Sequence, residues 1–195
     1  PIEWWYWTGH LFSQDGRRFG FEMACFKIKM GPMTFQMIHH AITDVQNQRF
    51  TYDVETSYSS PDEPDDPLKY FGFEIGDFAA SGGDGKDHIY GVLPNYVTNL
   101  QLNATKPIVY QHGNGYQEYP FNGYTYYYSR ERMAVTGTIE VEGEEIELSG
   151  SAWFDHQWGD IKNAANSGWD WFAIQLDDGR DIMVTVVRDE NNTFY

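Results

Sequence analysis

The sequence predicts an all-β protein: an antiparallel barrel or sandwich followed by the first hairpin of a second unit. Two observations predict it. The patterned stretches of the 195 residues alternate with a period of two, and short turn sequences rich in Gly and Asp separate them. No window of ten or more residues places apolar side chains at helical spacing. About ten such strands joined in sequence are typical of antiparallel barrels and sandwiches.

The strands are expected in chain order, and turn sequences lie at 14–16, 31–32, 82–85 and 142–144. The acidic, Pro-rich segment 60–69 is predicted to be a solvated loop, and 160–168 a short turn or helical linker. The expected strands are 3–12, 18–29, 34–44, 49–58, 70–76, 88–93, 96–104, 124–129, 133–141 and 145–154.

An internal repeat divides the chain. Segments 3–21 and 168–184 share an aromatic strand followed by an Asp-Gly-Arg turn. We interpret this as a tandem duplication, with one β-barrel domain over 1–160 and a linker plus the opening hairpin of a truncated second domain over 161–195. Two strands cannot bury a core alone, so we expect them to pack on the first domain or on a partner chain, which would allow a homo-oligomer.

The composition of the chain indicates which kinds of partner and ligand to expect. The 29 acidic and 13 basic residues give a net charge of −16, which argues against nucleic acid or an anionic membrane as a partner. No stretch approaches the roughly 18 apolar residues of a membrane span. Aromatic residues make up 17% of the chain and suit a pocket for an apolar ligand.

The single cysteine, Cys25, is predicted to be a buried structural thiol. The chain opens on Pro1 and ends in a loop, so we expect a fragment of a longer protein.

The sequence predicts neither a metal site nor a cofactor. The six histidines show no His-x-His or His-x-x-x-His spacing, and His39 and His40 would face opposite sides of a strand. The glycines of 82–85 lack the strand–loop–helix frame of a phosphate-binding loop, and there is no Gly-x-Ser-x-Gly elbow.

The stretch 149–159, SGSAWFDHQWG, contains the most reactive-looking pair, Asp155 and His156. If the strand continues through it, Asp155 faces one side and His156 the other. The later segment GWDWF places a second acid, Asp170, between two indoles. A carboxyl in apolar surroundings has a raised pKa and can donate a proton near neutrality, and aromatic faces stabilise a cation. These features are what acid-catalysed addition to an alkene or polyene cyclisation requires.

Three hypotheses remain open from the residues. The first is a cofactor-free enzyme acting on an isoprenoid or polyene, in which Asp155 or Asp170 donates the proton and His156 is its partner or the base for water. The second is a non-catalytic binding protein for a small apolar ligand. The third is a purely structural Trp–Asp–His cluster between barrels, with no ligand.

Six segments carry a resemblance to a known family: EWWYWTGHL, GRRFGFEMACF, TKPIVYQHGNGY, YTYYYSRERMAVTGTIEVEG, SGSAWFDHQWG and GWDWFAIQLDDGRDIMV. Together they resemble the lipocalin-like AttH/CrtC family, which includes the carotenoid 1,2-hydratases. The resemblance spans residues 3–188 and implies tandem lipocalin-like β-barrels in a periplasmic or secreted protein. It implies that His156 and Trp158 take part in hydration, with Asp155 beside them, and that Tyr128 faces the substrate. The hydratase branch has Tyr-Trp followed by Ala-Pro where this chain has YYSR at 127–130. The sequence of this chain is therefore closer to the AttH members of the family.

The predicted site therefore has two sets of residues and takes a small hydrophobic molecule. The catalytic set is Asp155, His156 and Asp170. The substrate-binding set is Trp153, Trp158, Trp169, Tyr128, Trp5 and His39.

Overall fold

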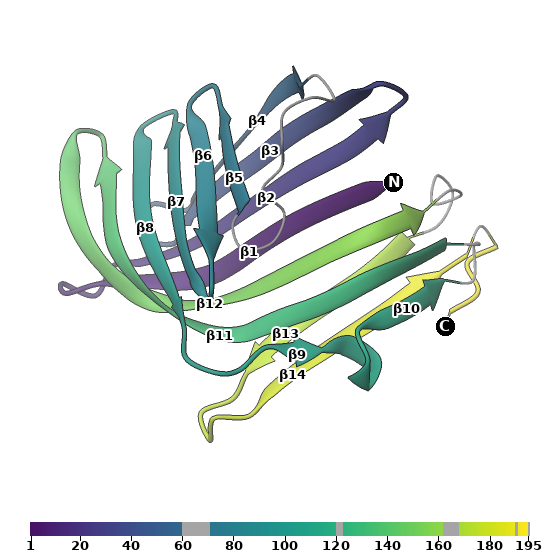
Figure 1. Cartoon of the computed structure of the whole chain (residues 1–195). Coiled ribbons are helices and arrows are strands. Elements are labelled where there is room, and N and C mark those ends of the chain that lie inside the picture. The colour runs from purple at the N-terminus through teal and green to yellow at the C-terminus, as the bar shows by residue number, and fades with distance from the viewer. Residues whose placement is uncertain (60–70, 120–122, 162–167, 190, 195) are drawn as a thin grey trace.

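The computed structural model describes residues 1–59, 71–119, 123–161, 168–189 and 191–194, and strands dominate it (Figure 1). Within these ranges the helical structure is a single 3-10 turn, η1 (Gln111–Gly113), and no helix is long and apolar enough to cross a membrane. The strands are β1 (Ile2–Ser13), β2 (Arg18–Met30), β3 (Met33–Asp44), β4 (Arg49–Ser59), β5 (Phe71–Ile75), β6 (Phe78–Gly83), β7 (Lys86–Leu93), β8 (Tyr96–Ala104), β9 (Val109–Tyr110), β10 (Tyr116–Tyr119), β11 (Gly123–Val141), β12 (Glu144–Ile161), β13 (Gly168–Gln175) and β14 (Asp181–Arg188).

The strands form a nearly closed antiparallel barrel. The sheet order is β4-β3-β2-β1-β12-β11-β8-β7-β6-β5, and β9 and β10 both pair with β11. The two end strands, β4 and β5, contact each other, which brings the sheet round on itself (Figure 1). The predicted all-β barrel is therefore confirmed. Strands β13 and β14 pair only with each other in the described structure, as a separate hairpin.

The structure differs from the predicted strands in several places. Strands β9 and β10 were not predicted, and β12 extends to Ile161, beyond the predicted end at 154. The segments 124–129 and 133–141 form one long strand, β11, whose pairing register shifts between Arg130 and Met133. Strand β6 was not predicted, because its sequence FAASGG has small side chains and a weak alternation. The predicted solvated loop 60–69 and most of the predicted linker 160–168 lie outside the described residues, although 160, 161 and 168 belong to strands.

Turn chemistry explains how the longest strands connect. Glu142 and Gly143 join β11 to β12, and both have positive φ angles, 53° and 92°. A two-residue turn of this kind matches the right-handed twist of its flanking strands, and glycine adopts it without steric cost.

Alternate side chains of the barrel strands fill its centre. Trp7, Leu11 and Phe154 are fully buried there, and Cys25 is buried as predicted. The polar His40 also lies inside, where its ring nitrogens contact the Glu22 carbonyl at 2.9 Å and the Thr98 hydroxyl at 2.8 Å. Burial lowers the pKa of His40 to about 4, so it is neutral at physiological pH.

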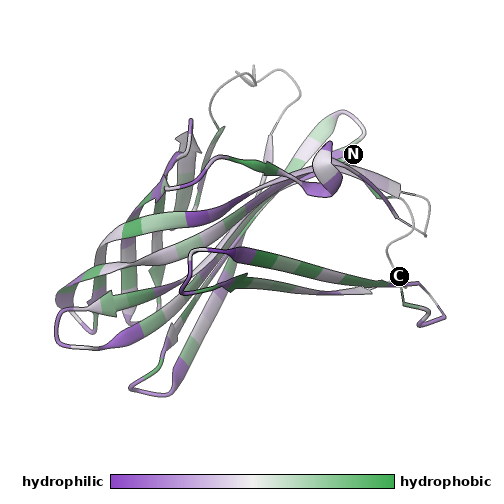
Figure 2. Cartoon of the chain, turned by 90° about the horizontal axis from the view of Figure 1, so that it is seen from below, coloured by the Kyte–Doolittle hydropathy of each residue, from purple (hydrophilic) through white to green (hydrophobic). Residues whose placement is uncertain are grey.

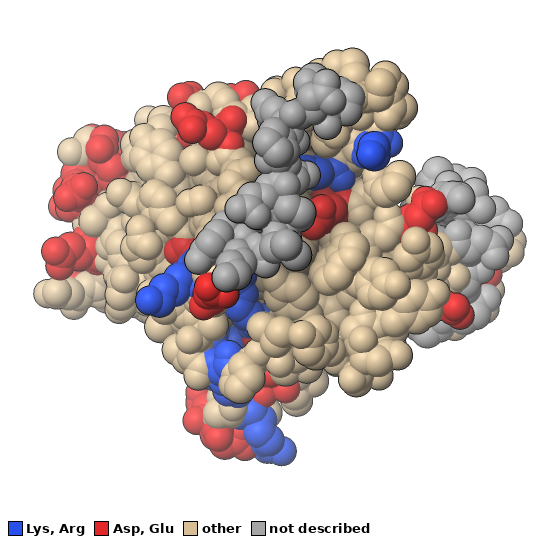
Figure 3. Space-filling view, viewed as in Figure 1, with Lys and Arg blue, Asp and Glu red and all other residues tan. Residues whose placement is uncertain are grey.

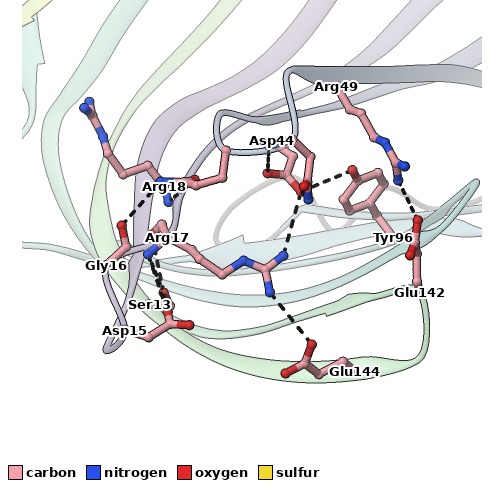
Figure 4. Close-up of polar contacts among 12 residues, drawn as sticks. Ser13, Asp15, Gly16, Arg17, Arg18, Asp44, Arg49, Tyr96, Glu142 and Glu144 are labelled. Atoms are coloured by element: carbon pink, nitrogen blue, oxygen red, sulfur yellow. Dashed lines mark hydrogen bonds and ion pairs between the residues drawn. The ribbon is translucent and has the colours of Figure 1, made fainter.

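A polar cluster around Asp44 connects opposite strands at one end of the barrel (Figure 4). The Asp44 carboxylate is fully buried and accepts hydrogen bonds from Asn47 Nδ2 at 2.7 Å and from the Tyr96 hydroxyl at 3.3 Å. The Arg17 guanidinium lies 3.9 Å from Asp44 and 3.9 Å from Glu144. These contacts join the end of β3 to the start of β8.

Replacing Asp44 with alanine is expected to lower the free energy of unfolding by about 3 kcal/mol, because the change leaves the buried Tyr96 hydroxyl without this acceptor and removes the buried charge that faces Arg17. Urea denaturation measures this loss. The control is Glu144→Ala, whose side chain is 76% exposed and should change stability by at most about 0.5 kcal/mol. Equal losses in both variants would contradict the role given to Asp44.

The hairpin β13–β14 has two unlike faces. The face toward the barrel carries Trp171, whose ring packs edge-on against Tyr6 at 5.5 Å and Trp153 at 6.0 Å. The other face carries the exposed apolar side chains of Phe172, Ile174, Ile182 and Val184. Figure 2 colours the hydrophobic residues of the hairpin green. The assignment of this hairpin to a second domain, and an oligomer formed through it, stay predictions.

Candidate functional site

Strand β12 (Glu144–Ile161) carries the two reactive side chains predicted from the sequence. The strand runs unbroken through both, so its alternation places Asp155 on the outer face of the barrel and His156 on the inner face. The sheet separates the two groups. Each must therefore be considered with its own neighbours.

A cavity of about 570 Å³ lies between the outer face of β1, β2 and β12 and the inner face of the β13–β14 hairpin. Figures 1 and 2 show the hairpin lying alongside the barrel. Most of the lining is apolar. Its Phe, Tyr and Trp residues are Trp4, Tyr6, Phe26, Tyr119, Tyr127, Trp169 and Trp171.

Asp155 lines this cavity and is almost completely buried. Its Oδ1 accepts hydrogen bonds from the Ser129 hydroxyl and from Trp153 Nε1, the latter at 2.7 Å, and its Oδ2 accepts one from the Tyr127 hydroxyl at 2.7 Å. Burial raises the pKa of Asp155 to about 6, although the three hydrogen bonds act in the opposite direction. Asp155 is thus a carboxyl that exchanges its proton near neutral pH.

Tyr127 links Asp155 to the hairpin. Its hydroxyl donates to Asp155 and accepts a hydrogen bond from Trp171 Nε1 at 3.3 Å. Burial and the neighbouring Asp155 carboxylate raise the pKa of Tyr127, so the phenol keeps its proton. The chain Trp171–Tyr127–Asp155 places an O–H group beside the buried acid at the cavity wall.

A second carboxyl in the cavity, Glu22, was not predicted from the sequence. It lies on β2, and the Tyr6 hydroxyl donates a hydrogen bond to it at 3.4 Å. Burial raises the pKa of Glu22. The signal for it is a lone acid on the outward face of an otherwise apolar strand, GFEMACF.

Of the other residues predicted for this region, some line the cavity or contact Asp155 and one lies outside the cavity. Trp169 and His39 line the cavity, and burial lowers the pKa of His39. Trp153 contacts Asp155 directly, as described above. Asp170 does not reach this cavity: it is about half exposed on the outward face of the hairpin and forms an ion pair with Arg188.

The other predicted residues meet on the inner face of the barrel. His156 stacks on Trp5 at 4.6 Å, and its ring lies 5.2 Å from Tyr128 and 4.8 Å from Trp158. Its Nε2 lies 2.8 Å from Glu3 Oε1, and no described residue bonds its buried Nδ1. Burial lowers the pKa of His156 despite the contact with Glu3. Glu3, a partner not predicted from the sequence, belongs to the first aromatic strand.

Known proteins place this architecture in a family. The AttH-like family matches residues 1–194. The chain belongs to the AttH-like family. This confirms the resemblance seen in the sequence, while the link to the carotenoid hydratase branch stays a prediction. No curated protein matches the chain.

Two solved structures share the fold of this AttH-like chain. An AttH protein from Nitrosomonas europaea is 25% identical, with a TM-score of 0.83 over 99% of this chain and 62% of its own. Kievitone hydratase from Nectria haematococca is 14% identical, with a TM-score of 0.66 over 98% of this chain and 63% of its own. This chain therefore spans less than two thirds of either structure, and the hydratase likeness shows the fold alone.

The hairpin of this AttH-like chain is anchored to the barrel near its turn. The Asp181 carboxylate forms ion pairs with Lys106 and with Arg132, the latter at 2.7 Å. Burial would raise the pKa of Asp181, but the hydrogen bonds from Arg132 and Lys106 outweigh it and lower the pKa. Gln175 Oε1 accepts a hydrogen bond from the Ser151 hydroxyl at 2.7 Å, and Gln175 Nε2 donates one to the Glu131 carbonyl at 2.7 Å. The hairpin is thus fixed at its turn while its aromatic end covers the cavity.

No metal-binding cluster is evident in the parts of the chain that the structure describes. Within them, no group of three or more His, Cys, Asp or Glu side chains is arranged to hold an ion. Acidic groups are nevertheless numerous on the surface and spread along the left side of the face in Figure 3.

Proposed function

We propose that this protein is a cofactor-free enzyme that protonates a double bond of a small isoprenoid or polyene in the cavity beside Asp155, leading to hydration or cyclisation. One observation carries the proposal: a mostly apolar cavity of about 570 Å³ is lined by a buried carboxyl whose pKa lies near 6. His156 has no role in this cavity, because it lies on the opposite face of the sheet.

The size of the cavity limits the substrate. A water molecule takes about 30 Å³ in the liquid, so 570 Å³ accommodates roughly 20 non-hydrogen atoms. A short isoprenoid fits within this limit. A long carotenoid would place only its end in the cavity and leave the rest outside.

The chemistry follows from the residues around the acid. Protonated Asp155 gives its proton to one carbon of the double bond, directly or through the Tyr127 hydroxyl, and the π electrons form the new C–H bond. The positive charge then falls on the more substituted carbon. Aromatic side chains such as Trp4 and Trp171 line the cavity, and aromatic faces stabilise a cation. Water or a second double bond of the same molecule attacks that carbon.

A carrier for a small apolar molecule is the second candidate. The observation that favours it is the hydrogen bonding of Asp155, whose two oxygens already accept bonds from three donors. In a carrier, this carboxylate and its three donors would hold the cavity wall in place and take no part in any reaction.

The two candidates differ in what happens to the ligand. The protein is incubated with geraniol or farnesol in water labelled with heavy oxygen, and mass spectrometry detects label in the product while tryptophan fluorescence detects binding. Labelled or cyclised product supports the enzyme. Quenching with unchanged ligand supports the carrier.

Thr185 lies on the hairpin side of the cavity and offers a test of location. Thr185→Trp should fill the cavity and reduce both quenching and turnover at least about tenfold, since it excludes ligand from a packed space. Phe172→Trp, on the outward face of the same hairpin, is the matched control and should leave both unchanged. Equal turnover or binding in wild type and Thr185→Trp would exclude this cavity as the site.

A further inference from the structure

Glu22 is a carboxyl that the proposed chemistry has not yet used. It lies on β2 and lines the cavity together with Ala24 and Phe26, the next two outward side chains of that strand. Among the described residues, no Lys or Arg forms an ion pair with it. A half-buried carboxyl without a cationic partner is costly in an apolar cavity, which favours a role in function over one in stability.

The carboxyls of Asp155 and Glu22 differ in how much of each remains free to react. Asp155 accepts three hydrogen bonds within the protein. Glu22 accepts one among the described residues, from Tyr6 at a long 3.4 Å. A carboxylate has about four acceptor positions, so Glu22 has more of them free for a water molecule in the cavity.

Tyr6 lies between the two acids. In the sheet it pairs with Asp155 of β12 on one side and with Ala24 of β2 on the other. Neighbouring strands are about 4.8 Å apart, so the backbones of β12 and β2 are separated by about 10 Å at this level. Both carboxyls line the same cavity of about 570 Å³, which is larger than a double bond and a water molecule together. Burial and the charges of Glu22 and Asp155 raise the pKa of Tyr6, which keeps its hydroxyl protonated.

We propose that Glu22 is the base that deprotonates the attacking water, opposite the proton donor Asp155. The role rests on the proposed function and makes hydration its outcome. Asp155 supplies a proton to carbon, water oxygen forms the C–O bond to the resulting cation, and Glu22 takes one proton from that water. The substrate has then gained one water molecule. Asp155 is left ionised and Glu22 protonated, and exchange with solvent restores both.

The test distinguishes the proton that Asp155 gives to carbon from the proton that Glu22 takes from the attacking water. Wild type, Glu22→Gln and Asp155→Asn are incubated with geraniol in deuterated water, and both hydration and deuterium exchange into recovered geraniol are measured. Glu22→Gln should lower hydration by about 10²-fold or more and keep the exchange, because Asp155 still forms a cation that reverts by losing a proton. Asp155→Asn should lose both. Glu147→Gln, on an exposed position of β12, is the control and should change neither.

The failures of the two proposals are distinguishable. Full hydration by Glu22→Gln together with none by Asp155→Asn would overturn the role of Glu22 and leave the acid in place. If wild type gives neither reaction, the proposed function fails and the role of Glu22 fails with it.

Discussion

Asp155→Asn is expected to lower turnover by about 10²- to 10⁴-fold while the barrel stays folded, because asparagine cannot donate an acidic proton. The variant retains an oxygen for Ser129 and Trp153, and its amide can donate to the Tyr127 hydroxyl in place of accepting from it. The loss is measured as the rate of product formation from geraniol or farnesol. Far-ultraviolet circular dichroism and the fluorescence of the tryptophans report on the fold.

The matched comparison is Asp170→Asn. Asp170 is the other acid expected between indoles, but its carboxylate pairs with Arg188 on the outward face of the hairpin. It should therefore keep wild-type turnover. A large loss in Asp170→Asn together with full activity in Asp155→Asn would place the proton donor outside this cavity.

The barrel could be predicted from the sequence because its strands are long and strongly alternating. In the segment RFGFEMACF of β2, large apolar side chains occur at every second position. This alternation indicates a β-strand with one buried face. Strand β6 has small side chains that carry no such signal, so its pairing is decided by contacts with β5 and β7. Pairings between distant segments are the part of the fold that local pattern does not encode.

The same limit applies to the site. Alternation predicts that Asp155 and His156 face opposite sides, and β12 has this arrangement. The alternation does not predict that Glu3 lies next to His156, because that contact joins residues 153 positions apart. It also does not predict that Glu22 shares a cavity with Asp155, since the cavity forms only where the hairpin covers β1 and β2. Residue type is visible in the sequence, whereas the partner of each residue depends on which strands become neighbours.

The free energy of unfolding of the wild-type protein, taken as the difference from that of the Asp155→Asn variant, should fall by about 3 kcal/mol between pH 4 and pH 7. Burial raises the pKa of Asp155 from an ordinary value of 3.8 to about 6. A raised carboxyl pKa means that the folded state binds the proton more tightly than the unfolded state. The stabilisation is fully present below about pH 4 and is lost as the pH rises through about 6. A tenfold difference in proton affinity between the folded and unfolded states corresponds to about 1.4 kcal/mol.

Comparing the two proteins isolates this one group, because Glu22 and the other titrating residues are common to both. The free energy of unfolding is measured by urea denaturation at intervals from pH 4 to pH 7, and the difference between the proteins is plotted against pH. The difference should fall from about pH 4 and level off near pH 6, and the pH at which it levels off gives the pKa of Asp155 in the folded state. Turnover limited by the protonated acid should decline above that same pH. A difference that stays constant across the range would mean that Asp155 remains ionised throughout, and a permanently ionised Asp155 could anchor Trp153 and Tyr127 but could not donate the proton.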